Sequence, residues 1–130
     1  QHIMYQNPDL TPDQRNQTWL ELEHKYRPWI DFDNLPFYGR GAGWQRQLHI
    51  YDAFYYIDYC LSTMAALQFF LLSLHDQKDA WERYLRLVRR AGTASYTELC
   101  ETAGLQVPFR DGSIKAIAQQ MSQWIAEHQV

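Results

Sequence analysis

Cysteine and long apolar runs are both scarce in this sequence. The two cysteines, Cys60 and Cys100, each lie in an apolar helical context. We expect both thiols to be buried and reduced, although a disulfide between them is also compatible with the sequence. The most apolar stretch, residues 60–74, has fifteen residues and contains Gln68, whereas a membrane span needs about 20. The N-terminal residues are neither basic nor apolar, which argues against a signal peptide and favours a cytoplasmic protein without a membrane partner.

Strong positive charge is also missing. The net charge is −3 and the pI is about 5.9, which argues against a nucleic-acid partner. The one basic cluster recurs at steps of three and four residues, and we interpret it as the solvated face of a single helix. It comprises Arg83, Arg86, Arg89 and Arg90.

Complete catalytic motifs are absent from the sequence. None of the five histidines lies in the His-Glu-x-x-His motif of zinc peptidases, and no serine or cysteine nucleophile signature occurs. Gly39, Gly41 and Gly43, in the stretch GRGAG, do not follow a strand and do not have the spacing of a dinucleotide-binding loop. Glu21 and His24 have the spacing of one di-iron motif, but such bundles need two copies. We interpret this pair as a surface pair, with a metal-binding bundle as the weakest alternative, and expect no metal bound to this chain.

Apolar residues are plentiful, at 46% of the chain with 15% aromatic, enough for a core in one domain. Capping boxes at Thr11 with Gln14 and at Ser95 with Glu98 mark two helix starts. No segment alternates in the manner of a strand. The sequence therefore predicts an all-α fold, a single helical domain over residues 1–130. Its five expected helices are residues 12–26, a helix ending at residue 74, and residues 76–90, 95–104 and 113–127.

The helix that ends at residue 74 is apolar on almost every side, so we expect it to be central. Two starts are compatible with the sequence. In the first, residues 44–50 form a helical turn or two and Asp52 caps a new helix that begins at Ala53; in the second, one unbroken helix runs from Trp44 to Leu74. Both place Tyr56 and Tyr59 three residues apart on this helix. Residues 27–43, rich in glycine and proline, predict a long functional or mobile loop before it.

Helical spacing also predicts the inner faces of the later helices. The expected inward residues are Trp81, Tyr84, Leu85 and Val88, followed by Ile114, Ile117, Met121, Trp124 and Ile125. These helices and residues 12–26 cover only part of the central helix. We therefore expect the chain to self-associate as a homo-oligomer, with a two-fold pair as the simplest form.

The most unusual stretch is residues 49–59, which read HIYDAFYYIDY. A phenol is costly to bury without a partner. Tyrosines clustered with a histidine at the start of an apolar helix therefore indicate a site lined with proton donors. The alternative is aromatic packing with the hydroxyl groups at the surface.

Residues 43–61 resemble the C-terminal signature of oligoendopeptidase-F-like zinc peptidases, which are related to thimet oligopeptidase; they read GWQRQLHIYDAFYYIDYCL. The resemblance continues on both sides, through NPDLTPDQRNQTWLELEHKYRPW before it and AWERYLRLVRRAGT and ELCETAGLQVPF after it. It covers nearly the whole chain. The zinc motif of that family and its third metal-binding glutamate would lie upstream of Gln1. Relatives usually have proline where this chain has Ala53, so the start of this helix is less sharply fixed here.

The resemblance implies a zinc-dependent enzyme that hydrolyses internal bonds of short peptides in a deep helical channel. By position, the catalytic residues would be Tyr59, Tyr56 and His49. Tyr59 would donate a hydrogen bond to the oxyanion, while Tyr56 and His49 would bind substrate or act as further donors. Tyr55 is assigned to packing. Zinc would be held by the rest of the catalytic domain, so this chain alone is expected to be inactive.

Two main functions therefore compete. The first is the C-terminal part of a zinc oligopeptidase, whose partners are short peptides and the rest of the catalytic domain. The second is a stand-alone helical interaction module that has this fold without the chemistry. The chain starts with Gln1 and not with Met, which favours the first interpretation.

Overall fold

The computed structural model of the protein describes residues 1–32 and 34–128. The chain, expected to form one domain, divides into two compact units, Gln1–Tyr56 and Ile57–Val130. Each unit is described by itself. The secondary structure of the described residues is helical and contains no strand, which confirms the all-α class.

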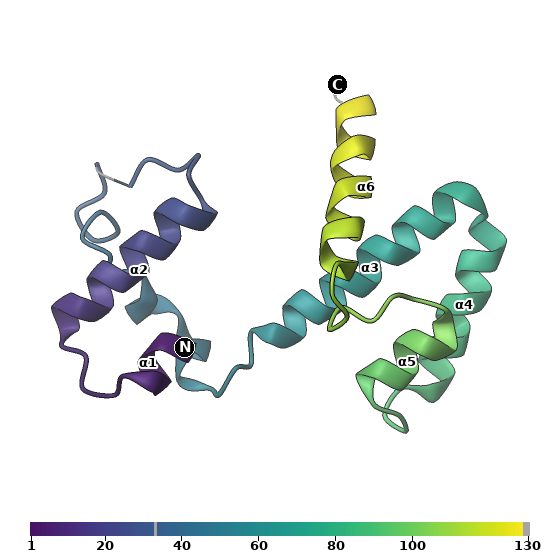
Figure 1. Ribbon diagram of the computed structural model, residues 1–130, viewed down its shortest axis with the longest axis horizontal. Coiled ribbons are helices and arrows are strands. Elements are labelled where there is room, and N and C mark those ends of the chain that lie inside the picture. Colours follow the sequence, from purple (N-terminus) through teal and green to yellow (C-terminus); the bar gives the residue numbers. More distant parts are fainter. Residues whose placement is uncertain (33, 129–130) are drawn as a thin grey trace. The chain divides into compact units, whose positions relative to one another are not determined.

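The first unit is built on α2 (Pro12–Tyr26), whose bounds agree with the expected helix (Figure 1). Its capping box is formed in both directions. The Gln14 backbone N–H donates to Thr11 Oγ1 at 3.3 Å, and the Thr11 N–H donates to Gln14 Oε1 at 2.8 Å. A short helix, α1 (His2–Gln6), precedes it and was not expected. Five residues are too few to show the periodicity from which a helix is predicted.

Two short 3-10 helices follow the long loop of the first unit. They are η1 (Ala42–Arg46) and η2 (Leu48–Tyr51), where the sequence predicts a helical turn or two. Gly41 lets η1 approach α2: it has a φ of 74°, and a Cβ at this position would lie 2.0 Å from the Asn16 carbonyl oxygen. Trp44 Nε1 then donates to Asn16 Oδ1 at 2.8 Å. This contact fixes η1 against α2.

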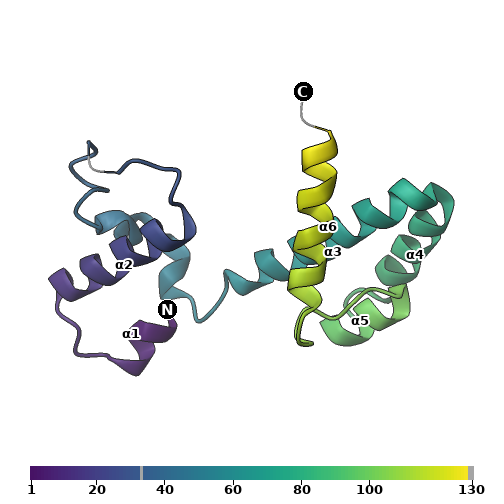
Figure 2. The ribbon, with the colours of Figure 1, turned by 45° about the horizontal axis from the view of Figure 1, so that its top comes forward.

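The second unit contains α3 (Ile57–His75), α4 (Gln77–Arg90), α5 (Tyr96–Ala103) and α6 (Ser113–Glu127). Only Asp76 separates α3 from α4, so the chain reverses there into a helical hairpin (Figures 1 and 2). Asp76 caps α4 by accepting a hydrogen bond from the Asp79 N–H at 3.0 Å. α5 packs against α4, and α6 packs against α3.

The core of the second unit forms where α5 and the segment after it meet the helical hairpin. Its buried residues are Cys100, Ala103, Leu105 and Val107, packed against Ala65, Phe69, Leu72, Leu87 and Tyr96. The Tyr96 hydroxyl donates to the Leu61 carbonyl at 2.7 Å. Burial, and then a hydrogen bond with Cys100, raises the pKa of the Tyr96 phenol, and burial raises the pKa of the Cys100 thiol. Both groups therefore stay protonated at neutral pH.

The start of α3 differs from both expected starts. The helix begins at Ile57, so it neither begins at Ala53 nor runs unbroken from Trp44. Asp52 is extended (φ −96°, ψ 122°), and Phe54 has a φ of 56°. A non-glycine residue in the left-handed region cannot continue a right-handed helix. Tyr56 consequently lies in the turn before α3, whereas Tyr59 lies in its first helical turn.

α3 is much less covered than expected. Gln68 is its only buried residue within the described chain, and Cys60, expected to be buried, is exposed and free. The helix is also longer than the fifteen-residue apolar stretch from which a membrane span was judged too short. By length and composition alone, the 19 residues of α3 would suffice to cross a bilayer, a test that core helices of soluble proteins also pass.

The inner faces of two helices were only partly predicted. On α4 the buried side chain is Ala80, while Trp81, Tyr84 and Val88 are exposed. On α6 Ile117 is buried, but Ile114 and Ile125 are about half exposed. Periodicity identifies which face is apolar, but it does not tell whether a neighbouring element covers that face.

Most of the basic cluster on α4 is solvated, in line with the prediction, and Arg83 is its one member that is not fully exposed. Arg83 Nε donates to Asp79 Oδ2 at 2.6 Å within α4, and its Nη1 donates to the Ala103 carbonyl of α5 at 3.4 Å. Arg90 donates to Thr102 Oγ1 at 2.9 Å. Arg86 and Arg89 are exposed. Two of the four arginines therefore join α4 to its neighbours, because a long side chain reaches polar groups beside its stem.

Candidate functional site

His49 and Tyr56 lie together in the first unit. The His49 ring is 5.4 Å from the Tyr56 ring, centroid to centroid, in an edge-on arrangement at 77°. It is also 4.7 Å from the ring of Tyr55. Tyr55, assigned to packing from the sequence, therefore forms one side of a three-ring cluster with the imidazole between two phenols.

Asp52 orients the imidazole of this cluster. Its Oδ2 lies 3.2 Å from His49 Nδ1. A carboxylate at one ring nitrogen fixes the tautomer and the direction of the ring, so a ligand would meet the imidazole through Nε2. Both side chains are substantially exposed, at 41% and 64%, which leaves the cluster accessible from solvent.

The side chain of Gln1 holds the backbone beneath the cluster. Its Nε2 donates to the carbonyl oxygens of His49 (3.1 Å), Ile50 (2.8 Å) and Asp52 (2.6 Å). These carbonyls lie at the end of η2, where the His49 carbonyl also accepts a hydrogen bond from the Asp52 N–H at 3.2 Å. Sequence reasoning missed this contact, because no local pattern links residues so far apart along the chain.

Tyr56 is fixed through its hydroxyl. The hydroxyl donates to Gln47 Oε1 at 3.0 Å, and the side chain as a whole is 41% exposed. Gln47 connects η1 to η2 and was not recognised as a site residue from the sequence. A tyrosine held at its hydroxyl in this way keeps oxygen lone pairs for a ligand while its ring is restrained.

Tyr59 belongs to the second unit. It lies in the first turn of α3, its side chain is 51% exposed, and its carbonyl accepts a hydrogen bond from Ser62 Oγ at 3.1 Å. The structure therefore brings His49 and Tyr56 together in one unit. The juxtaposition of Tyr59 with them stays a prediction.

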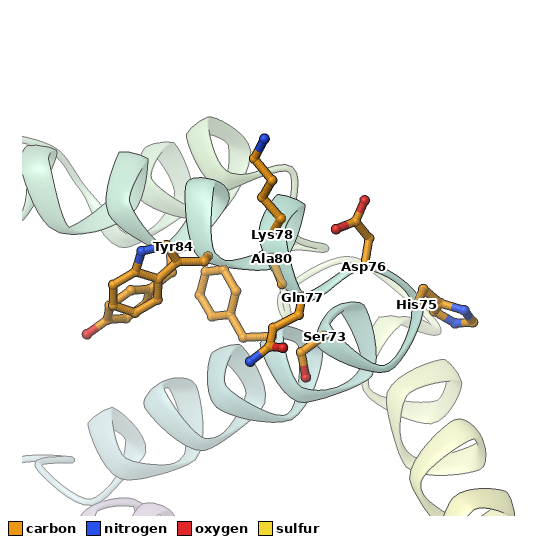
Figure 3. A pocket seen from close by; sticks show the side chains of 9 residues that line it. Ser73, His75, Asp76, Gln77, Lys78, Ala80 and Tyr84 are labelled. Atoms are coloured by element: carbon orange, nitrogen blue, oxygen red, sulfur yellow. The ribbon is translucent and has the colours of Figure 1, made fainter.

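A cavity of about 880 Å³ lies between α3 and α4, outside the predicted site. Its wall is aromatic, from Phe69, Trp81 and Tyr84. Figure 3 shows Ser73 and Gln77 between the two helices, with Lys78 extending away from them. This cavity contains none of the catalytic residues that the resemblance implies, so it is a separate feature of the second unit.

No group of three or more His, Cys, Asp or Glu side chains suited to a metal ion occurs in residues 1–32 and 34–128. The pair of His49 and Asp52 supplies two of these groups, and zinc sites use three or four protein ligands. The described residues therefore do not fit a zinc ion by themselves. Hydrogen bonding and orientation are the chemistry that the three-ring cluster offers.

Solved structures match almost the whole chain. Over 98% of its length it is 40% identical to a protein assigned as an oligoendopeptidase F, with a TM-score of 0.89. It is 42% identical to PZ peptidase A, solved with an inhibitor, again with a TM-score of 0.89. It is 31% identical to an oligoendopeptidase F from Bacillus anthracis strain Ames, with a TM-score of 0.72.

The chain spans only part of each of these proteins. It covers 23% of the first, 23% of PZ peptidase A and 20% of the Bacillus anthracis protein. No family model and no curated protein matches it. The matches therefore relate this chain to one segment of much longer peptidases.

Proposed function

Because this chain corresponds to a segment of the oligoendopeptidase F peptidases, we propose that it is part of a zinc-dependent enzyme that hydrolyses internal bonds of short peptides. Its share of the work is to supply a wall of histidine and tyrosine that binds substrate and stabilises the oxyanion. The observation that carries the proposal is the three-ring cluster of His49, Tyr55 and Tyr56, held by Asp52, Gln47 and Gln1.

His49 and Tyr56 hold the peptide backbone in this proposal. With Nδ1 directed at Asp52, His49 presents Nε2 as a hydrogen-bond acceptor to a backbone N–H of the substrate. Tyr56 adds a second polar contact beside it, since its hydroxyl is restrained by Gln47. Restrained groups lose little entropy when the substrate binds, so they position the scissile bond efficiently.

Tyr59 is the donor to the developing oxyanion. Attack on a peptide carbonyl places negative charge on its oxygen, and a phenol O–H can donate a hydrogen bond to that charge. Such a donor acts mainly in the transition state, where one hydrogen bond is typically worth about 3–4 kcal/mol. It follows Tyr56 by three residues in the sequence, and in this proposal both tyrosines act on the same bound peptide.

The zinc ligands and the general base of such an enzyme would come from the rest of the catalytic domain, because the described residues do not fit a metal site. The chain alone is then inactive. In this proposal the catalytic domain is all-helical, the enzyme is cytoplasmic, and its partners are short peptides.

The direct test is hydrolysis by the complete protein that contains this segment. We expect internally quenched fluorescent peptides to be cut at internal bonds, and the rate to fall when a zinc chelator is added and recover with zinc. The purified 130-residue chain serves as the control and should give no hydrolysis. A complete protein that cuts none of a varied set of short peptides would contradict the proposal.

The exposed apolar faces of α3 and α4 support the interaction module as a second candidate. Trp81 is 58% exposed and Ile57 is 51% exposed, and exposed apolar patches favour association. We therefore propose that the chain by itself pairs with a second copy. Sedimentation velocity should show a dimer, and a clean monomer at high concentration would contradict this pairing.

A further inference from the structure

Glu23 is a buried carboxylate in α2 that the proposed site does not use. The residue is 6% exposed, and its Oε1 accepts a hydrogen bond from the Arg27 guanidinium. Its Oε2 is buried and has no hydrogen-bond partner among the residues that the structure describes. A buried charged oxygen without a donor is destabilising and rare in folded proteins. It therefore indicates an external donor.

A cavity of about 270 Å³ adjoins this carboxylate. Half of its lining is apolar or aromatic, comprising Trp19, Phe32, Leu35 and Tyr38, and the other half comprises Glu23, Arg27, Gly43 and Gln47. Gly43 keeps the space between two of the rings open. A Cβ at that position would lie 2.8 Å from Trp19 Nε1 and 3.3 Å from Tyr38 Cδ1. The cavity thus has the size and lining for one aromatic side chain.

The charges around the cavity select a neutral donor. Arg27 already neutralises Glu23 and also lies over the Phe32 ring, with 5.8 Å from Cζ to the centroid. Arg46 donates to the Tyr38 hydroxyl at 3.2 Å. An added cation would meet both guanidinium groups, whereas a neutral O–H or N–H would not. The terminal torsion of a glutamate is soft, so the carboxylate can turn an oxygen to the cavity without moving α2.

Gln47 joins this cavity to the three-ring cluster. It lines the cavity, and its Oε1 accepts the hydrogen bond from the Tyr56 hydroxyl. We propose that the cavity binds an aromatic side chain that bears one neutral donor, the phenol of tyrosine or the indole of tryptophan, with that donor directed at Glu23. In the complete protein, the cavity would be a subsite for one side chain of the peptide held at His49 and Tyr56, and this assignment rests on the proposed function.

Binding of amino-acid amides tests the cavity without requiring activity. N-acetyl-L-tyrosinamide, N-acetyl-L-tryptophanamide and N-acetyl-L-phenylalaninamide are titrated into the full chain, following the Trp19 indole N–H by NMR. We expect the first two to bind about tenfold more tightly than the phenylalanine derivative, since a hydrogen bond to a charged acceptor is worth at least that much. Equal affinity for all three would overturn the proposal, as would tighter binding of N-acetyl-L-lysinamide.

Variants locate the effect. Glu23→Gln should reduce the tyrosine preference to below about threefold, while the matched control Glu21→Gln, on the same helix with its carboxylate bonded to Gln17, should retain it. Gly43→Ala should weaken all three aromatic ligands together, because its methyl group fills the cavity. Circular dichroism confirms that each variant is folded. A preference that survives in Glu23→Gln, or aromatic binding that survives in Gly43→Ala, would overturn the assignment.

Kinetics with the complete protein then separate this assignment from the proposed function. Peptide pairs that differ only by tyrosine or phenylalanine are compared by kcat/KM, and the tyrosine peptide should be preferred by about tenfold. Selective binding of the amides without any peptide hydrolysis would overturn the proposed function and leave the cavity assignment standing. Peptide hydrolysis without selectivity in either assay would overturn the cavity assignment and leave the proposed function standing.

Discussion

Each of the two compact units buries one long polar side chain within a helix, and the two are treated differently. In the second unit, Gln68 donates to the Gln106 carbonyl (3.0 Å) and accepts from the Gln106 N–H (2.7 Å). In the first unit, Glu23 uses one oxygen for Arg27 and leaves the other without a donor in the described chain. A satisfied amide joins two segments, whereas an incompletely satisfied carboxylate is suited to recognition.

This contrast extends to the surroundings of the two side chains. Gln68 lies beside an apolar core around Cys100 and Leu105. Glu23 adjoins an aromatic cavity whose other lining comes from the loop after α2. In our proposals, peptide contacts are therefore assigned to the first unit, whereas the second unit supplies Tyr59 and the apolar faces of α3 and α4 that pair with a second copy.

The largest expected effect concerns Tyr59, the one residue assigned to chemistry in the second unit. In the complete enzyme, Tyr59→Phe should lower kcat by roughly 100- to 1,000-fold with little change in KM, because the donor acts only in the transition state. Steady-state assays with a quenched fluorescent peptide measure this. Tyr84→Phe, in the cavity between α3 and α4, is the matched control. A wild-type kcat in Tyr59→Phe would contradict the role of Tyr59 in chemistry and leave the second unit with a purely structural role.

His49 should show the next largest effect, in the first unit. His49→Ala should lower kcat/KM by about 10- to 100-fold, because a backbone group of the bound substrate left without its hydrogen-bond partner costs about 1–3 kcal/mol. Zinc content of the complete enzyme, measured by atomic absorption, should not change, since His49 is assigned to substrate. His24→Ala, at an exposed position on α2, is the control. Loss of zinc would mean that His49 is a metal ligand.

Gln68 tests the stability of the second unit directly. Gln68→Leu removes both hydrogen bonds to Gln106 and leaves two backbone groups without partners, so the free energy of unfolding should fall by about 2 kcal/mol. Urea denaturation followed by circular dichroism measures the loss. Gln119→Leu, on the exposed face of α6, should change stability by less than about 0.5 kcal/mol. If both substitutions lowered the free energy of unfolding equally, the hydrogen bonds of Gln68 would have no special role in stabilising the second unit.

The smallest effect concerns the start of α5. Glu98 accepts hydrogen bonds from the Ser95 hydroxyl (2.7 Å) and N–H (2.8 Å), and these bonds lower the pKa of its carboxyl group. A lowered pKa in the folded state stabilises the protein above the ordinary carboxyl pKa, and that contribution is lost as the pH falls through the lowered value. The wild type should therefore have a higher Tm than Glu98→Gln at pH 7, and the difference should shrink below about pH 4.

The exposed Glu82 provides the control for this pH dependence. Glu82→Gln, on α4, changes the charge by the same amount without removing a cap. Its Tm should follow that of the wild type across the whole pH range. A parallel shift in both variants would assign the effect to net charge and not to the capping box.

Local chemistry made much of the fold predictable. Thr11 with Gln14 and Ser95 with Glu98 marked helix starts that the structure confirms, because a cap needs only a few neighbouring residues. The predicted start of α3 was wrong, because Phe54 has a left-handed φ and an aromatic residue gives no sign of that conformation in the sequence. The exposure of Trp81 and Ile114 was missed, because coverage depends on elements distant in the sequence.

The candidate site was predictable to a similar degree. The resemblance singled out His49 and Tyr56, which the structure brings together. It did not single out Gln1, Gln47 or Glu23, whose importance comes from contacts or burial in the folded chain. Glutamate and glutamine are common on loops and helix surfaces, so the sequence alone does not identify these three as site residues.

The hydrogen bonds of Gln68 also have a consequence for folding kinetics. They join residues 38 positions apart in the sequence, so they form only after α4, α5 and the intervening turns have brought the chain back to α3. Contacts that close such a loop are made late, after its entropy cost has been met by other packing. We therefore expect the loss of these bonds to accelerate unfolding while folding keeps nearly its original rate, so that Gln68 sets how long the second unit stays folded.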